Sequence, residues 1–327
     1  MHKTSLLGSI LFAAVATMAG SNAQAAVTSI NLGNYAVQNT YALDLNAGLV
    51  SGLEASAVTY ARDRNSLFYV GDEGTGVVEI SKTGTTLGSM TFDWANTGSS
   101  KHDTEGLTYL GGGVLVVSEE RLYDAYRFSY SNGGSATLAN SFVSISNANV
   151  GNNGLEGISY DARGAGSFVT VKQVAAEDIL AGSLTFASGA GGTSTMAQLF
   201  NPALMGVASL SDVQTLSSVD ALVGTAAADN LLVLSLDSRK LIEVNRAGTV
   251  LSSFDLSNVL PNNGIEGVTV DEKGTIYLVA EQIQDGTPNT KSQLIVLAAP
   301  VPEADTYALM LAGMGLVGLL ARRRKLA

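Results

Sequence analysis

A short motif that recurs along the chain constrains the fold more than any other feature. Its clearest copies are Gly151–Tyr160 and Pro261–Val270, and a looser copy spans Asp103–Tyr109. Each copy combines a turn, an acidic residue, a glycine and an alternating apolar and hydroxyl run, which is typical of a β-strand. Two weaker copies, Glu54–Tyr60 and Ser218–Val223, complete a series of five.

The spacing of these copies predicts the architecture. Aligning each copy on the strand-like run that follows it gives one column of residues: Ser56, Glu105, Glu156, Asp220 and Glu266. The longest step in this column, from Glu156 to Asp220, is 64 residues, and the other steps are close to 50. Repeats of about 40–50 residues that hold several short strands are typical of a β-propeller. We therefore predict an all-β fold, a single propeller with five blades of four antiparallel strands, six blades being the alternative count.

The two ends of the repeat series predict how the ring closes. The last repeat supplies only three strands, ending with Gln293–Leu297. The N-terminal run Tyr41–Leu45 resembles Leu251–Leu256, the last strand of the fourth repeat. We expect this N-terminal strand to complete the last blade, which leaves no free sheet edge there. The extra residues of the long third repeat, 178–212, are expected to form a loop or lid over one face.

Both terminal segments have the composition of sorting signals. A positive start, an apolar run and the A-x-A site Ala23–Ala25 predict a secretory signal peptide over residues 1–25. The propeller is expected over 26–299 and a separate tail over 300–327. In that tail the apolar segment 307–321 precedes the basic cluster Arg322–Lys325. Fifteen residues are fewer than the ~20 of a full membrane span. We therefore predict a transient transmembrane helix with its basic end on the cytoplasmic side, a plain membrane anchor being the alternative.

The composition excludes several kinds of mechanism. The chain has no cysteine and only two histidines, His2 and His102. Thiolate metal sites, cysteine nucleophiles and mechanisms that need two histidines are therefore excluded. The formal net charge of −11 argues against nucleic acid as a partner and favours a cation or a neutral or basic partner. No serine nucleophile elbow and no phosphate-binding loop occurs, and no catalytic residue is assigned.

The acidic column carries the main prediction of a site. In a propeller, equivalent strand positions meet around the axis, and Glu54 lies two residues before Ser56 on the same strand face. Five acids are thus expected to ring one mouth of the channel as candidate metal ligands: Glu54, Glu105, Glu156, Asp220 and Glu266. A hard cation such as Ca²⁺ would relieve their repulsion. Hydrogen bonding between blades and acid–base catalysis are the alternatives that stay open.

A second column follows the next strand of each repeat. It reads Asp72, Glu119, Gln173, Leu236 and Glu281, and it is acidic in three of five repeats. His102 with Asp103, beside Glu105, is the one place where a base and carboxylates cluster, and we interpret it as a polar loop between blades. Trp94 and the tyrosines follow strand spacing, which favours core or rim positions over a sugar-binding platform.

The C-terminal tail resembles a known sorting signal. Val301–Glu303, then Thr306–Ala308, an apolar segment and an Arg-rich end are similar to the PEP-CTERM signal, with Ala304 in place of the usual second proline. The resemblance implies a Gram-negative bacterium that makes exopolysaccharide. It also implies a membrane-bound sorting protease as a partner and delivery to the outer surface or the extracellular matrix.

The repeats themselves resemble the SdiA-regulated (YjiK-like) propeller family. The resemblance rests on the Glu-Gly-hydrophobic-Thr/Ser-Tyr strand together with Val70–Glu73, Val117–Arg121 and the segment Leu199–Met205. There is some similarity to phytase-like esterase propellers. The family has no settled activity, and the resemblance implies an extracytoplasmic propeller with a calcium site near the channel.

These observations lead to two hypotheses of function. The first is an exported binding module, stabilised by Ca²⁺, that contacts exopolysaccharide or a surface protein. The alternative is a calcium-dependent phytase-like phosphoesterase. That enzyme needs basic side chains to hold phosphate, and Lys101, Arg121 and Lys172 are the candidates. So few basic side chains favour the binding module over the phosphoesterase.

Overall fold

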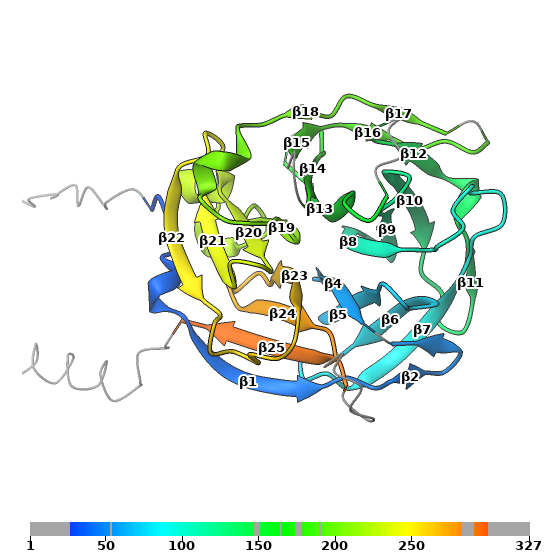
Figure 1. Ribbon diagram of the computed structural model, residues 1–327, viewed down its shortest axis with the longest axis horizontal. Coiled ribbons are helices and arrows are strands. Elements are labelled where there is room, and N and C mark those ends of the chain that lie inside the picture. Colours follow the sequence, from blue (N-terminus) through cyan, green and yellow to red (C-terminus); the bar gives the residue numbers. More distant parts are fainter. Residues whose placement is uncertain are drawn as a thin grey trace, which may run out of the picture.

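Five antiparallel sheets stand around a central axis (Figure 1). The structure, a computed structural model, describes residues 27–299 apart from 53, 147–150, 164, 174–177, 190 and 283–290. The all-β propeller is confirmed, with five blades rather than six. The predicted signal peptide, sorting tail and apolar segment 307–321 lie outside the described residues. Within those residues, no helix is long and apolar enough to cross a membrane.

The strands of the first two blades follow the predicted runs closely. Blade 1 consists of β4 (Ala55–Ala61), β5 (Ser66–Gly71), β6 (Gly76–Ile80) and β7 (Thr86–Asp93). Blade 2 consists of β8 (Thr104–Gly111), β9 (Val114–Glu119), β10 (Asp124–Ser129) and β12 (Phe142–Ser144). Between β10 and β12 the chain crosses back, and β11 (Ser135–Thr137) pairs in parallel with β7. A short hairpin, β2 (Asn46–Ala47) and β3 (Val50–Ser51), precedes blade 1.

The other three blades complete the ring. Blade 3 consists of β13 (Leu155–Asp161), β14 (Ser167–Lys172), β15 (Ile179–Gly182) and β18 (Ala197–Gln198). Blade 4 consists of β19 (Asp212–Thr215), β20 (Leu231–Ser235), β21 (Lys240–Val244) and β22 (Val250–Asp255). Blade 5 consists of β23 (Ile265–Val270), β24 (Ile276–Ala280), β25 (Gln293–Ala298) and the N-terminal strand β1 (Ala36–Ala42). The innermost strands are β4, β8, β13, β19 and β23 (Figure 1).

The ring closes through the N-terminal strand, as predicted. Strand β1 pairs antiparallel with β25, so that Tyr41 lies opposite Leu294. The strand begins earlier than the predicted run and ends at Ala42, although the N–H of Leu43 still donates to Ser292 O at 2.8 Å. Strand β1 thereby covers the edge of β25 that blade 5 would otherwise expose.

The prediction of a lid over 178–212 is wrong. This segment supplies β15 and β18, which are the third and outer strands of blade 3. Between them, β16 (Leu184–Thr185) and β17 (Thr193–Ser194) form a hairpin. The prediction failed because the fourth inner strand was expected at 218–223. It lies instead at β19, and the 3₁₀ helices η4 (Asp220–Leu222) and η5 (Ala226–Asp229) separate it from β20.

A belt of polar side chains joins the inner strands of all five blades. Each hydroxyl residue of the motif accepts a hydrogen bond from the next blade. The acceptor–donor pairs are Thr59 Oγ1 with Tyr109 N at 3.1 Å, Thr108 Oγ1 with Tyr160 N at 2.9 Å, Ser159 Oγ with Thr215 N at 3.0 Å, and Thr269 Oγ1 with Tyr60 N at 3.1 Å. Between blades 4 and 5, Thr269 Oγ1 donates to Gln214 Oε1 at 3.0 Å.

Small residues in the same strands let the blades approach one another. A Cβ placed on Gly106 would lie 2.8 Å from the carbonyl oxygen of Glu156 in the next blade. Blade 4 has Asp212 at the equivalent position, and its carboxylate accepts the N–H of Val268 in blade 5 at 2.7 Å. The motif glycine therefore serves blade packing. In blade 4 a buried carboxylate forms the link to the next blade instead.

Candidate functional site

Three acids of the predicted column occupy β-bulges at the start of their inner strands. In β8 the pairing with β9 shifts between Thr104 and Gly106, which leaves Glu105 as the extra residue. The same shift brackets Glu156 in β13 and Glu266 in β23. A bulge re-aims the side chain of its extra residue. The repeated sequence motif therefore corresponds to a β-bulge at the same position in blades 2, 3 and 5.

The charges of these three acids act on one another. Burial raises the pKa of the Glu105 carboxyl well above its usual range, and the charges of Glu156 and Glu266 raise it further. Burial also raises the pKa of Glu156, with contributions from Glu120 and Glu266. Mutual repulsion between acids from blades 2, 3 and 5 indicates that they meet near the axis.

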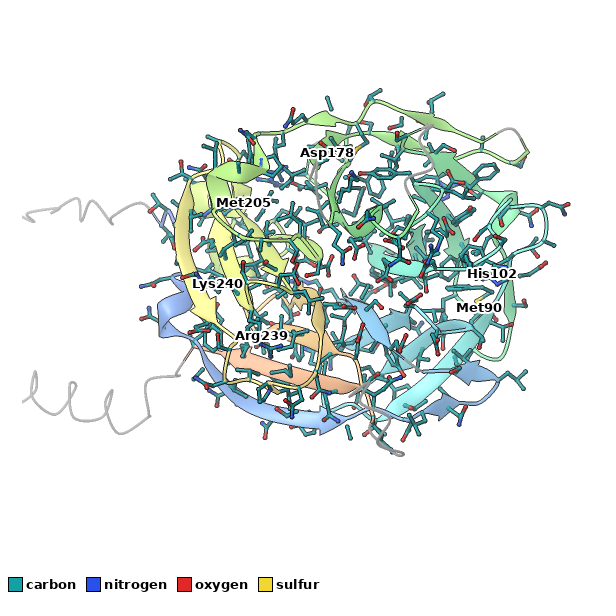
Figure 2. The ribbon with its side chains drawn as sticks, viewed as in Figure 1. Met90, His102, Asp178, Met205, Arg239 and Lys240 are labelled. Carbon is teal, nitrogen blue, oxygen red and sulfur yellow. The ribbon has the colours of Figure 1, made fainter. Side chains whose placement is uncertain are left out.

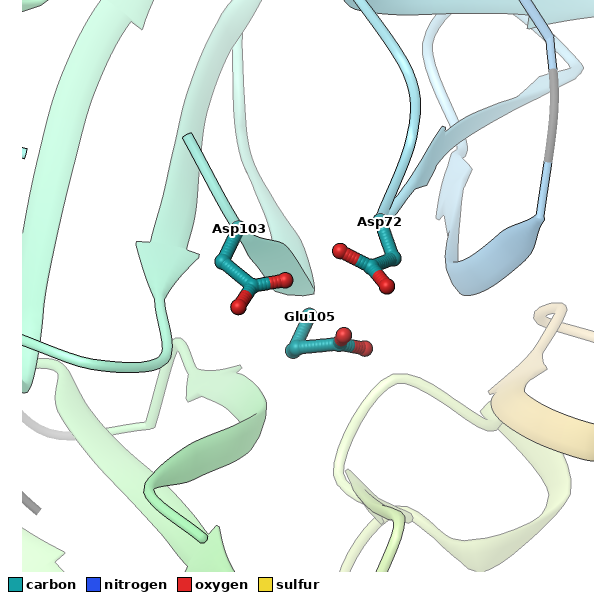
Figure 3. A group of neighbouring side chains, drawn as sticks. All are labelled: Asp72, Asp103 and Glu105. Atoms are coloured by element: carbon teal, nitrogen blue, oxygen red, sulfur yellow. The ribbon is translucent and has the colours of Figure 1, made fainter. Parts of the chain in front are cut away.

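The tightest acidic group lies between blades 1 and 2. Asp72, Asp103 and Glu105 point toward one another, and each has a carboxylate oxygen within 4.8 Å of the others (Figure 3). Asp72 follows β5 and Asp103 precedes β8. Burial, a hydrogen bond with Asp103 and the charge of Asp103 raise the pKa of Asp72 to about 8. Burial opposes ionisation of Asp103, but its bonds from Asp72 and Glu120 and the charge of Arg121 hold its pKa below the usual range. The raised pKa of Asp72 and the lowered pKa of Asp103 thus favour a single proton held between the two aspartates.

More acids surround this group. Glu120 accepts the N–H of Gly154 in blade 3 at 3.2 Å, and burial raises the pKa of its carboxyl to about 7. Arg121 donates to Asp103 and to Asn152, so its charge is already paired. We call the whole group the acidic end, and it comprises Glu54, Asp72, Asp103, Glu105, Glu120, Glu156, Glu266 and Glu281.

Four of the five predicted residues lie at the acidic end. Glu105, Glu156 and Glu266 meet as expected. Glu54 lies near Glu266, because its charge contributes to the raised pKa of the Glu266 carboxyl. Burial and then the charges of Glu73, Glu281 and Asp103 raise the pKa of Glu54 itself.

The placement of Asp220 is wrong. It begins the 3₁₀ helix η4, is exposed, and pairs with the guanidinium of Arg62 at 2.8 Å. The equivalent of Glu266 in blade 4 is Ser211, which lies midway between Glu156 and Glu266 in the sequence. Its Oγ accepts the N–H of Leu236 at 2.9 Å, just as Ser56 Oγ accepts that of Asp72 at 3.2 Å.

The second column also needs one correction. Glu120, not Glu119, is equivalent to Asp72, because its N–H donates to Asp103 O as that of Asp72 donates to Glu54 O. The carboxylate of Glu119 accepts instead from Ser99 and from the N–H of Leu122.

Sequence reasoning missed Asp103 as a candidate ligand. The signal was present, since Asp103 precedes Glu105 by two residues as Glu54 precedes Ser56. His102 does not supply a base to this group. Its ring stacks on Trp94 with 5.1 Å between centroids, at the periphery of the ring of blades (Figure 2).

The chemistry of the acidic end is that of a hard cation site. Its donors are carboxylate oxygens, which Ca²⁺ and Mg²⁺ prefer. Glu105 and Glu266 are only partly buried, so both retain contact with solvent.

Comparison with known proteins decides the family. The family model described as SdiA-regulated matches residues 34–283, which include all five inner strands. The chain belongs to the SdiA-regulated family. Residues 300–325 match the PEP-CTERM protein-sorting motif, which indicates an exported protein associated with the membrane or cell surface.

Solved structures with a similar course of the chain include two enzymes. Glutaminyl cyclase from Myxococcus xanthus is 13% identical, with a TM-score of 0.48, and the match covers 82% of this chain and 97% of that chain. A luciferin-regenerating enzyme is 12% identical, with a TM-score of 0.43, and the match covers 80% of this chain and 95% of that chain.

Proposed function

We propose that this member of the SdiA-regulated family is an exported binding module whose propeller is stabilised by Ca²⁺ at the acidic end. The observation that carries the proposal is the convergence of Asp72, Asp103 and Glu105 within 4.8 Å, beside Glu156 and Glu266. Carboxylates held so close repel one another when ionised, and a divalent cation removes that cost.

A cation at this position would link several blades. The acids come from blades 1, 2, 3 and 5, so one ion that contacts several of them bridges sheets that are distant in sequence. Since ligating carboxylates must be ionised, binding would release the proton shared by Asp72 and Asp103. The ion would therefore replace that proton as the neutralising charge.

The sorting motif supports the location that we propose. A membrane-bound sorting protease is the proposed partner of the tail matched at 300–325. We place the processed propeller at the outer surface or in the extracellular matrix of a Gram-negative bacterium. Exopolysaccharide or a surface protein would be its binding partner there, and the net charge of −11 argues against nucleic acid.

A thermal melt with and without Ca²⁺ tests the cation site. The purified chain, stripped with a chelator, is expected to melt at a higher temperature as Ca²⁺ is added. Glu105→Gln and Glu156→Gln should abolish most of this shift. Asp220→Asn is the matched control, because this exposed acid lies outside the acidic end and should leave the shift intact. A shift that all three variants retain, or no shift in the unaltered chain, refutes the proposed site.

A calcium-dependent phosphoesterase is less well supported. Such an enzyme needs cationic side chains that can hold phosphate, and Arg121 is already paired with Asp103 and Asn152. Hydrolysis of p-nitrophenyl phosphate in Ca²⁺, lost in Glu105→Gln, would favour the enzyme over the binding module.

A further inference from the structure

A cavity of about 660 Å³ lies at the opposite end of the inner strands from the acidic end. The inner strands run from the acidic end to the cavity. In β8, for example, four residues, or about 13 Å, separate Glu105 at the acidic end from Tyr109 at the cavity. The cavity has the size of a typical small-molecule site. Its lining includes Tyr60, Tyr109 and Tyr160, which end the motif in three successive blades and for which the sequence favoured core or rim positions over a sugar-binding platform. No member of the acidic end lines it.

The tyrosine rings are held in place by their own surroundings. Tyr109 stacks on Phe68 with 5.9 Å between centroids, and its hydroxyl accepts the N–H of Gly113 at 2.7 Å. Tyr160 packs on Phe168 with 5.2 Å between centroids. All three tyrosines are half-buried. Rings that are fixed before a ligand arrives lose little entropy when it binds.

Both arginines that line the cavity are already paired with carboxylates, and Asp63 on the same wall accepts the N–H of Gly112 at 3.0 Å. Arg62 donates to both carboxylate oxygens of Asp220, at 2.8 and 2.9 Å. Arg163 is shared between Asp161 and Asp229. An anion would meet these neutralised guanidiniums and a chain of net charge −11, which does not favour its binding.

An organic cation is not favoured either. The cavity contains the two guanidiniums, and the ring of Tyr60 already has Lys82 Nζ 4.6 Å from its centroid. Glu272 also lines the cavity. The Tyr60 hydroxyl and the charge of Lys82 hold the pKa of its carboxyl below the usual range despite partial burial, and its Oε2 is buried with no hydrogen-bond partner among the described residues. The two guanidiniums and the two carboxylates that line the cavity balance in formal charge, so the cavity favours neither an anion nor a cation.

We infer that this cavity binds a neutral saccharide. A sugar ring has apolar C–H faces that suit the tyrosine rings, and hydroxyls that suit planar and hydroxyl side chains. The exposed hydroxyl of Ser218 and the Oε2 of Glu272 supply such groups along the wall. This inference rests on the proposed binding function and names its ligand class, but it does not depend on the cation site.

Ligand-detected NMR and calorimetry on the purified chain test the inference. The probes are maltotetraose, cellotetraose, chitotetraose and galactotetraose, with tetramethylammonium and inorganic phosphate as charged probes. Ser218→Trp adds bulk at an exposed position on the cavity wall and is expected to abolish saccharide binding. Ala203→Trp, in the exposed turn of η3 (Pro202–Met205), is the matched control and should bind as the unaltered chain does.

A second pair of variants distinguishes the contribution of the Tyr160 ring to binding from that of its hydroxyl. Tyr160→Phe keeps the aromatic wall and should keep affinity within about threefold, whereas Tyr160→Ala should lose about tenfold or more. The inference is overturned if none of the saccharides binds, or if a charged probe binds and the saccharides do not. It is also overturned if Ser218→Trp leaves the affinity for a saccharide unchanged. The Ca²⁺-dependent melt of Ser218→Trp keeps the two proposals distinct, because that shift is expected to remain whether or not saccharide binds.

Discussion

Thr108 Oγ1 accepts the backbone N–H of Tyr160 at 2.9 Å, across the interface between blades 2 and 3. Because inner strands of adjacent blades do not form a continuous sheet, this N–H has no partner within its own blade's ladder on that side. A buried donor without a partner is costly. The hydroxyl of the repeated motif therefore has a structural role that recurs around the ring, while the acid three residues earlier is left for other chemistry.

Replacement of Thr108 tests the role of this belt. Thr108→Val keeps the shape but leaves the Tyr160 N–H unsatisfied, so the free energy of unfolding should fall by about 1–3 kcal/mol. Thr108→Ser keeps the hydroxyl and should recover most of this loss. Urea unfolding of both variants measures the difference. A larger loss in Thr108→Ser than in Thr108→Val would show that packing of the methyl group, rather than the hydrogen bond, matters at this site.

The acidic end predicts that stability depends on pH in a definite direction. The folded pKa of Asp72 is raised from 3.8 to about 8 and that of Glu120 from 4.5 to about 7. A raised pKa means that the folded state holds these protons more tightly than the unfolded state. Their stabilising effect is complete below about pH 4 and is lost as the pH rises through about 7 to 8. In chelator, the melting temperature should fall over this range.

Calcium should reverse part of this loss. Because Ca²⁺ replaces the shared proton, its stabilising effect should be larger at about pH 8 than at about pH 5. Asp72→Asn removes one of the titrating groups and should flatten the fall in chelator. A melting temperature that rises with pH in chelator would contradict the assignment.

The inner strands and their bulges could be predicted from the sequence wherever the repeated motif is intact. Glycine at 106, 157 and 267 and the hydroxyls that follow mark inner strands, and a repeated acid before each glycine marks a repeated bulge. Blade 4 breaks the rule, because Asp212 occupies the glycine position and Ser211 the acidic one. The sequence pattern therefore predicts the strand at 218–223 with Asp220 in the acidic column, whereas the inner strand begins eight residues before Asp220, at Asp212.

The three-dimensional grouping of the acids was less accessible. Asp72 and Asp103 belong to different blades, and nothing in their local sequence indicates a shared proton. The cavity at the tyrosine end depends likewise on ring closure, which brings the ends of all five inner strands together. Both features arise from contacts between blades rather than from the pattern within one repeat.

The hydrogen bonds of Arg239 are expected to stabilise the fold through the geometry of its guanidinium group. Its guanidinium donates to the carbonyl oxygens of Val259, Leu260 and Asn263 at 2.6, 3.0 and 2.9 Å, and so holds the segment that leads into blade 5. A lysine cannot reproduce this fork, so Arg239→Lys should lower the free energy of unfolding by about 1–3 kcal/mol. The adjacent, exposed Lys240 (Figure 2) is the control, and Lys240→Ala should change it by no more than about 0.5 kcal/mol. Similar losses in both variants would contradict the proposed role.

Removal of the closing strand should convert blade 5 into an exposed edge. A chain that lacks residues 1–42 loses the partner of β25, whose Leu294 and Ile295 are paired with Tyr41 and Thr40. An unpaired edge with apolar side chains tends to recruit another chain, so we expect a lower melting temperature and concentration-dependent oligomers in size-exclusion chromatography with light scattering. A chain that lacks only residues 1–26 keeps β1 and is the control. If the shorter chain stays monomeric and equally stable, the ring does not depend on β1 for closure, and the blades hold together through the polar belt and their apolar interfaces alone.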